Sequence, residues 1–320
     1  MKKELTKLYP MVQFKKDTWE IDEFDAASMF LLNGPEKAML IDCGMGIGDL
    51  RGAVEMLIGD KPLIVVITHG AVDHTANGRQ FDELWIHPLD QDKPIPQAVE
   101  RRRWDMERIS KRQKGCIGAP YTMFNLYPYD IEFDIREPGP DEKMPVLHDL
   151  YDGKQFDLGG GRIVTCYHTP GHSPGHMIFL DEQTRTLIVG DALNFNLGVA
   201  GGSVETTLAY LKRIRDELGD KYDGIYNGHH DFRALGAPLD DDCLENAIAL
   251  LEDAMNGHIV PCEVPSPWGQ SIPLTKKREN PQDKAPAANN ISRPARKRVT
   301  LRRGRNFISI DPDNIYAKKD

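Results

Sequence analysis

The sequence predicts an α/β fold, on three observations. Short apolar runs typical of strands recur along the first 230 residues, and four of them end in a turn that carries histidine or aspartate. Two longer stretches, 203–218 and 239–255, have apolar residues at helical spacing. The hydrophobic content of 40% is enough for a large core, although the length of 320 residues would also allow two domains.

The N-terminal part is predicted to form strands over 18–21, 28–32 and 37–42, followed by a helix over 49–57. Three glycines, Gly44, Gly46 and Gly48, precede this helix. A dinucleotide-binding turn would need glycine or alanine at position 49, where this chain has Asp49, whose carboxylate would repel a pyrophosphate. The glycines therefore predict a tight turn between strand and helix.

The apolar run 63–67 reads as a strand buried on both faces, and Thr68, His69, Asp73 and His74 follow it directly. Imidazole and carboxylate groups crowded at the carboxyl end of a strand indicate a metal site. A polar loop that happens to hold two histidines is the alternative for this segment alone. A short helix is expected over 75–80.

Three clusters further along the chain repeat the arrangement. His172 lies in a Pro-Gly-His turn between strands expected at 162–167 and 177–180. Asp191 ends the apolar run 186–189, and His229 follows another short strand. Four expected strands are thus each followed by histidine or aspartate. The simplest explanation is that these side chains bind one buried cation.

In this order the motifs resemble those of the metallo-β-lactamase-fold hydrolases, the superfamily that includes hydroxyacylglutathione hydrolases (glyoxalase II) and acyl-homoserine lactonases. The family signature THxHxDH corresponds to Thr68–His74 and is followed by the Pro-Gly-His turn, the Gly-Asp pair and a late Gly-His pair. The resemblance covers residues 20–257. It implies a four-layer αββα sandwich of the metallo-β-lactamase type.

The resemblance also implies roles for six residues. His69 and His172 correspond to ligands of a first metal site, Asp73, His74 and His229 to those of a second, and Asp191 to the bridge between them. The metal is expected to be zinc, as one or two ions, with manganese or iron as alternatives. Its hydroxide would attack the carbonyl carbon of an ester, thioester or lactone, and Asp73 would act in catalysis. Residues that bind the substrate stay unknown.

One position departs from the signature, because Ala71 stands where the family has its second histidine. The first metal site thereby loses an imidazole, which should weaken it. Three explanations stay open: a natural one-metal enzyme, a weakened or inactive relative, and a variant in which histidine was replaced by alanine to stop turnover. The last is slightly favoured, since alanine is the usual experimental replacement.

We expect a catalytic domain over 1–257, a Pro-rich basic extension over 258–320 and an insertion at about 88–151. The insertion is rich in aromatic residues and is expected to cover the site, as it does in the resembling family. Within the extension, residues 276–305 hold eleven Lys or Arg against two acidic residues. This basic segment is expected to dock on the acidic body or to form a mobile arm. Residues 306–310 would return as an edge strand.

The formal charge of −9 argues against a general nucleic-acid binder, and an RNA-binding arm is the weaker interpretation of the basic segment. Five scattered cysteines, the absence of a signal peptide and the absence of a long apolar segment predict a cytoplasmic protein that does not span the membrane. A homodimer stays open. Two other functions also stay open: a phosphodiesterase or ribonuclease of the same superfamily, and a non-catalytic binding protein that retains the fold.

Overall fold

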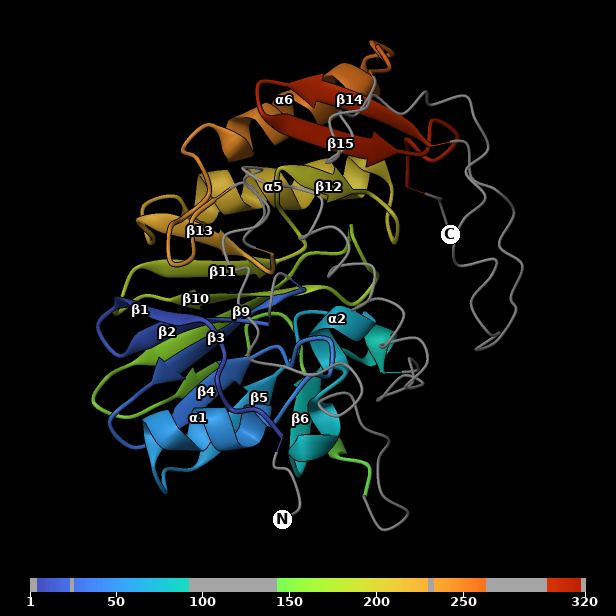
Figure 1. Cartoon of the computed structure of the whole chain (residues 1–320). Coiled ribbons are helices and arrows are strands. Elements are labelled where there is room, and N and C mark those ends of the chain that lie inside the picture. Colours follow the sequence, from blue (N-terminus) through green and yellow to red (C-terminus); the bar gives the residue numbers. More distant parts are fainter. Residues whose placement is uncertain (1–4, 24–25, 92–142, 230–232, 263–297, 318–320) are drawn as a thin grey trace, which may run out of the picture.

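The computed structural model of the protein describes residues 5–23, 26–91, 143–229, 233–262 and 298–317. Two sheets lie face to face in the middle of the molecule, with α1 on the outer side of one and α5 and α6 on the outer side of the other (Figure 1). This is the four-layer αββα arrangement that the sequence predicts. Most of the predicted insertion and most of the basic segment 276–305 lie outside the described residues.

The first sheet has seven strands in the order β1-β2-β3-β4-β5-β6-β7. Its first four strands are antiparallel, whereas β4, β5, β6 and β7 run parallel to one another. The bounds of the seven strands are Met11–Lys15, Thr18–Asp22, Ser28–Asn33, Ala38–Ile41, Leu63–Val66, Glu83–Ile86 and Val146–Asp149. Helix α1, Leu50–Ile58, covers the outer face, and Asp49 caps it by accepting a hydrogen bond from the backbone N–H of Gly52.

The second sheet has five strands in the order β13-β11-β10-β9-β8. Its members are Gly224–Asn227, Thr186–Gly190, Met177–Asp181, Ile163–His168 and Gln155–Asp157, respectively. Neighbours pair antiparallel except for β11 and β13, which are parallel. Parallel strands present their carboxyl ends at the same edge of a sheet, so the residues that follow β11 and β13 emerge side by side.

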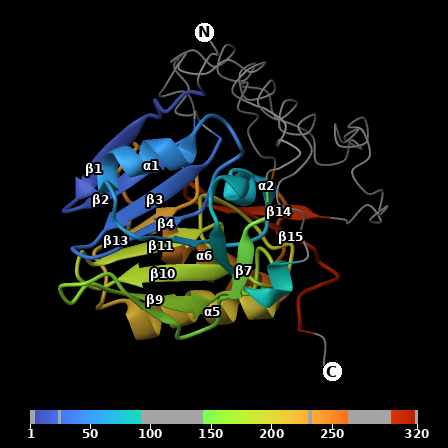
Figure 2. The same cartoon turned by 90° about the horizontal axis from the view of Figure 1, so that it is seen from below.

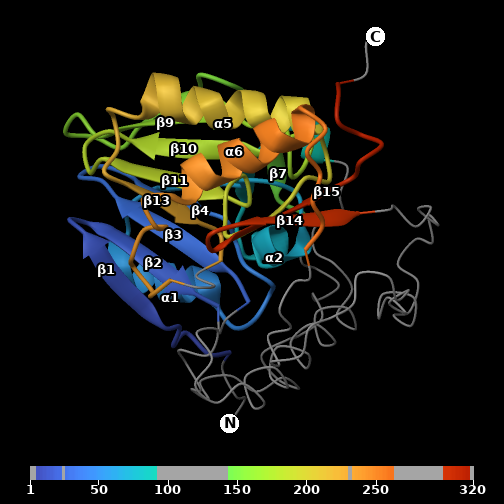
Figure 3. The same cartoon turned by 90° about the horizontal axis from the view of Figure 1, so that it is seen from above.

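The central strands are mostly apolar because both of their faces are covered. In β10, Phe179 packs between the two sheets, whereas Ile178 and Leu180 face the helices. In β3, Leu32 packs between the sheets, whereas Leu31 faces α1. The alternation puts one core between the sheets and one under each helical layer, and Figures 2 and 3 show these outer layers from below and from above.

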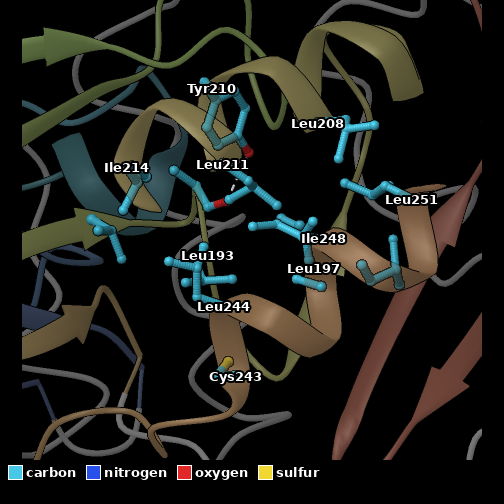
Figure 4. Packing of buried hydrophobic residues seen from close by; sticks show 14 of the residues in the cluster. Leu193, Leu197, Leu208, Tyr210, Leu211, Ile214, Cys243, Leu244, Ile248 and Leu251 are labelled. Atoms are coloured by element: carbon cyan, nitrogen blue, oxygen red, sulfur yellow. Dashed lines mark hydrogen bonds between the residues drawn. The ribbon is translucent and has the colours of Figure 1, made fainter. Parts of the chain in front are cut away.

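Helices α5, Val204–Leu218, and α6, Cys243–Met255, pack against each other over the second sheet. Leu211 and Ile214 of α5 lie close to Leu244 and Ile248 of α6 in the apolar core between them (Figure 4). Ser203 is the N-cap of α5, and it forms a capping box with Thr206. Helix α6 begins at 243 and not at 239, because the backbone N–H of Leu239 donates to Ile225 of β13 instead.

A third sheet joins β12, Asn196–Gly198, to a C-terminal hairpin of β14, Val299–Arg303, and β15, Asn306–Ile310. The strand expected at 306–310 is therefore present, but it is the central strand and not an edge. It pairs parallel with β12 and antiparallel with β14. The backbone N–H of Phe307 also donates to the carbonyl oxygen of Phe195, so the hairpin braces the segment that follows Asp191.

Candidate metal centre

The edges described above place the predicted ligands at one end of the sandwich. The turn after β5 carries His69, and α2, Val72–Thr75, carries Asp73 and His74. This helix begins three residues earlier than expected, with Ala71 in extended conformation before it, and a 3₁₀ turn, Gly78–Gln80, follows. The loop between β9 and β10 carries His172. Asp191 directly follows β11, and His229 lies two residues after the end of β13.

Asp191 lies at the centre of this group and contacts three of the imidazoles. Its carboxylate oxygens lie 3.5 Å from Nε2 of His172, 3.8 Å from Nε2 of His74 and 3.3 Å from Nε2 of His229. On the other side, Oδ2 of Asp73 lies 3.5 Å from Nε2 of His229 and 3.9 Å from Nε2 of His74. The ring of His69 packs against that of His74, with 4.2 Å between centroids. All six predicted residues therefore lie together, although their assignment as ligands stays a prediction.

The neighbours of three histidines fix which ring nitrogen faces the site. Nδ1 of His74 lies 2.7 Å from Oδ2 of Asp42, and Nδ1 of His229 lies 3.1 Å from the carbonyl oxygen of Ala26. Since these oxygens only accept, both Nδ1 atoms must donate, so Nε2 is the nitrogen that faces the site and that offers a lone pair when the ring is neutral. Thr68 donates to Asp42, so its hydroxyl oxygen is able to accept from Nδ1 of His69 at 3.1 Å. Thus all three rings point Nε2 toward the carboxylates of the candidate centre.

Several of these atoms are buried without a hydrogen-bond partner among the described residues. They are Nε2 of His69, Nε2 of His74, Nδ1 of His172 and Oδ1 of Asp191. Burying polar atoms without partners is costly, and native proteins rarely leave them so unless an ion or another ligand satisfies them. Imidazole nitrogen and carboxylate oxygen are suitable donors for zinc and similar divalent cations. The residues therefore fit a bound cation.

The electrostatics agree with this fit. Burial lowers the pKa of His74, but Asp42, Asp73 and Asp191 outweigh burial and raise it to about 10. Burial likewise opposes protonation of His229, yet Asp191 and Asp73 raise its pKa to about 9. The carboxylates thus favour positive charge at this position. A divalent cation supplies that charge and takes the place of the protons.

Two close triads of donor atoms occur among the described residues, and both contain His74. One is His69, His74 and Asp191, and the other is Asp73, His74 and His229. His172 lies beside His69, with 4.8 Å between ring centroids, and the expected division, in which the two share a site, stays a prediction. Because a ring nitrogen has one lone pair and Nδ1 of His74 is committed to Asp42, His74 serves one ion at a time.

Asp42, which directly follows β4, is buried beside the site. It accepts hydrogen bonds from the backbone N–H and the hydroxyl of Thr68 and contacts His74. It thus orients His74 directly and His69 through the hydroxyl of Thr68. His230, the neighbour of His229, lies outside the described residues.

Two buried groups near the site were not singled out from the sequence. His176 stacks on His69, and its Nε2 accepts a hydrogen bond from the backbone N–H of Asp191 at 3.1 Å. Burial and the neighbouring His172 lower its pKa to about 3, so it stays neutral. Asp90, in the 3₁₀ turn Pro88–Asp90, accepts from the backbone N–H of Gly70 and the hydroxyl of Ser173. It thereby links the turn that carries His69 to the loop that carries His172. No sequence motif predicts these hydrogen bonds.

Comparison with known proteins adds three similarities. Residues 22–231 match the family model of the metallo-beta-lactamase superfamily. The acyl-coenzyme A thioesterase MBLAC2 of Homo sapiens is 27% identical over 210 residues, which are 60% of this chain and 65% of that protein. The atrochrysone carboxyl ACP thioesterase of Claviceps purpurea is 32% identical over 103 residues, which are 31% of this chain and 30% of that protein.

Among solved structures, a metallo-beta-lactamase from Pontibacter korlensis has the same fold, with a TM-score of 0.51 and 14% identity. The alignment covers 77% of this chain and 100% of that chain. The match to the human thioesterase leaves about a third of that protein uncovered. No helix in the described part of the chain is both long and apolar enough to cross a membrane.

Proposed function

The chain belongs to the metallo-beta-lactamase superfamily, and from this we propose that it is a metal-dependent hydrolase that cleaves an acyl thioester. The observation that carries the proposal is the convergence of the Nε2 atoms of His69, His74 and His229 on the carboxylate of Asp191, with the first two of these nitrogens buried and without a partner among the described residues. The two relatives named as thioesterases favour a thioester over an oxygen ester or a lactone. The substrate is accordingly a small molecule or a carrier with an activated acyl group.

We propose one cation per chain, held by Asp73, His74, His229 and Asp191. Both triads compete for Nε2 of His74, and Ala71 removes an imidazole from the side on which His69 and His172 lie. Zinc is the metal that this donor set suits best, with manganese and iron as alternatives. When bound, such an ion lowers the pKa of a coordinated water and polarises a carbonyl oxygen.

The residues of the chain then have distinct tasks. Asp73 is partly exposed, with 25% of its side chain accessible, so it is able both to contact the ion and to reach a water molecule. It accepts the proton of the attacking water and delivers it to the departing sulfur. The imidazoles hold the geometry, and Asp42 holds the ring of His74. Covalent catalysis by the chain is not needed.

The decisive experiment measures zinc content and hydrolysis together. Protein purified without chelator is assayed for bound metal and against matched panels of acyl thioesters, esters, lactones and a bis-aryl phosphate. We expect about one zinc per chain and the highest kcat/KM on thioesters. Activity should vanish after dialysis against a chelator and return with zinc.

Other outcomes identify the alternatives. Selective cleavage of the phosphate would favour a phosphodiesterase. Protein that carries no metal and does not bind added zinc would be a binding protein that keeps the fold, and the proposal would then be wrong.

A further inference from the structure

Glu23 is a fully buried carboxylate near the proposed centre that has no part in the mechanism above. It directly follows β2, and its side chain turns toward the loop between β4 and α1. Its carboxylate accepts hydrogen bonds from the backbone N–H groups of Met45, Gly46 and Ile47, at 3.0 Å and 2.8 Å for the last two. The side-chain amide of Asn77 donates a fourth at 3.1 Å. The glycine-rich turn thus cradles an anion that the chain itself provides.

The backbone of the turn is shaped around this carboxylate. Gly44 has a φ of +66°, and a Cβ atom there would lie 2.6 Å from Oε2 of Glu23. Glycine is therefore needed both for the conformation and for the close approach. Gly48, with a φ of +69°, has a different reason to be glycine, because a Cβ atom there would meet Thr6 and Tyr9.

The cradled turn is bonded to the helix that carries Asp73 and His74. The backbone N–H of Cys43 donates to the carbonyl oxygen of His74 at 2.8 Å. The backbone N–H of Ala76 donates to the carbonyl oxygen of Gly44 at 2.9 Å. A shift of the turn would therefore move the backbone of His74.

The backbone of Glu23 is bonded to the segment that orients His229. Its carbonyl oxygen accepts from the N–H of Ala26 at 2.9 Å, and its own N–H donates to Ala27 at 2.8 Å. The carbonyl oxygen of Ala26 is the group that faces Nδ1 of His229 at 3.1 Å. The two rings that Glu23 reaches by these two routes, His74 and His229, lie 5.4 Å apart at right angles.

We infer that Glu23 is a positioning residue that sets the spacing and orientation of His74 and His229 around a divalent cation. The inference rests on the proposed metal-dependent function. Glu23 contacts neither ring, and it acts through the turn that it anchors and through Ala26. Its task is the pre-organisation of the half of the centre that keeps all of its ligands despite Ala71.

The energetics favour this task over simple stabilisation. Burial raises the pKa of Glu23 to about 7, against the effect of the hydrogen bonds that it accepts. A charge with such a desolvation cost is a poor means of holding two loops together, since apolar packing would do so without the cost. The carboxylate instead fixes the conformation of the turn, because its two oxygens accept hydrogen bonds from the backbone N–H groups of three successive residues.

The test uses cobalt(II) as the probe, because its visible spectrum reports ligand geometry independently of turnover. In Glu23→Gln the side chain keeps its size, but its NH₂ group replaces an oxygen that accepts hydrogen bonds. This NH₂ group then faces backbone N–H groups of the turn, and two donors cannot bond to each other. Asp181→Asn is the matched control: Asp181 is equally buried, accepts from Arg162 at 2.6 Å, and lies at the far end of β10 from His176. Asn77→Ala removes a single donor and is a milder variant should Glu23→Gln not fold.

We expect Glu23→Gln to bind cobalt about 10- to 100-fold more weakly, with a shifted visible spectrum, and Asn77→Ala to change both in the same direction by less. Asp181→Asn should lower the thermal midpoint yet keep the affinity and the spectrum. Wild-type affinity and spectrum in a folded Glu23→Gln, or in Asn77→Ala if the former does not fold, overturn the positioning role alone. Failure of the wild-type protein to bind cobalt or zinc would overturn the proposed function together with it.

Discussion

Nδ1 of His74 lies 2.7 Å from Oδ2 of Asp42, and both side chains are buried. This contact fixes the tautomer of the imidazole, so that the lone pair of Nε2 faces Asp73 and Asp191. The geometry of the proposed centre thus depends on a carboxylate that would never touch the ion.

Replacing Asp42 by asparagine should weaken zinc binding about 10- to 100-fold, because the amide no longer favours the Nδ1–H tautomer of His74. Competition with a chromophoric chelator measures this affinity. Asp49→Asn is the control, since Asp49 caps α1 and pairs with Lys7 but contacts none of the proposed ligands, so zinc affinity should stay unaltered. Equal affinities for wild type and Asp42→Asn would show that the contact does not orient a ligand.

Replacing Ala71 by histidine should restore the missing imidazole of the signature. We expect the zinc content to rise from about one to about two ions per chain, together with kcat/KM on the best thioester. Elemental analysis and steady-state kinetics measure the two changes. Ala71→Phe supplies a ring without a ligand atom and should raise neither. An unchanged zinc content in Ala71→His would mean that the first half of the centre is lost for other reasons.

Asp73→Asn separates catalysis from metal binding. Because His74, His229 and Asp191 stay in place, most of the zinc should be retained, whereas kcat should fall by about 100-fold or more once the base is gone. Metal content and kcat are measured on the same preparation. If both fall in proportion, Asp73 acts only as a ligand of the ion, and its proposed role as the base is wrong.

The stability of the metal-free protein should depend on pH through Glu23. Its pKa is raised by burial from 4.5 to about 7, so the folded chain holds this proton more tightly than the unfolded chain. The contribution is fully present below pH 4.5 and is lost as the pH rises to about 7, which amounts to about 3 kcal/mol. Urea unfolding of wild type and Glu23→Gln across this range measures it. Curves that run parallel in the two proteins would contradict the assignment.

The strand ends at the proposed centre could be predicted from the sequence, because each apolar run and the histidine or aspartate that follows it are neighbours along the chain. A run such as 63–67 shows its burial by composition, and the histidines and acids stand next to it. The roles of Glu23 and Asp90 were not accessible, since each acts on backbone groups far along the chain and neither belongs to a repeated pattern. The same holds for β15, whose central place depends on a strand more than 100 residues earlier.

The parallel pairing of β12 with β15 has a consequence for biosynthesis. Asn196 and its neighbours leave the ribosome well before Phe307, their partner in the third sheet. At ordinary elongation rates of about 5–20 residues per second, the nascent chain waits several seconds or more before this pairing becomes available. The segment at 195–198, which follows Asp191, therefore gains its strand partner only after β15 has emerged.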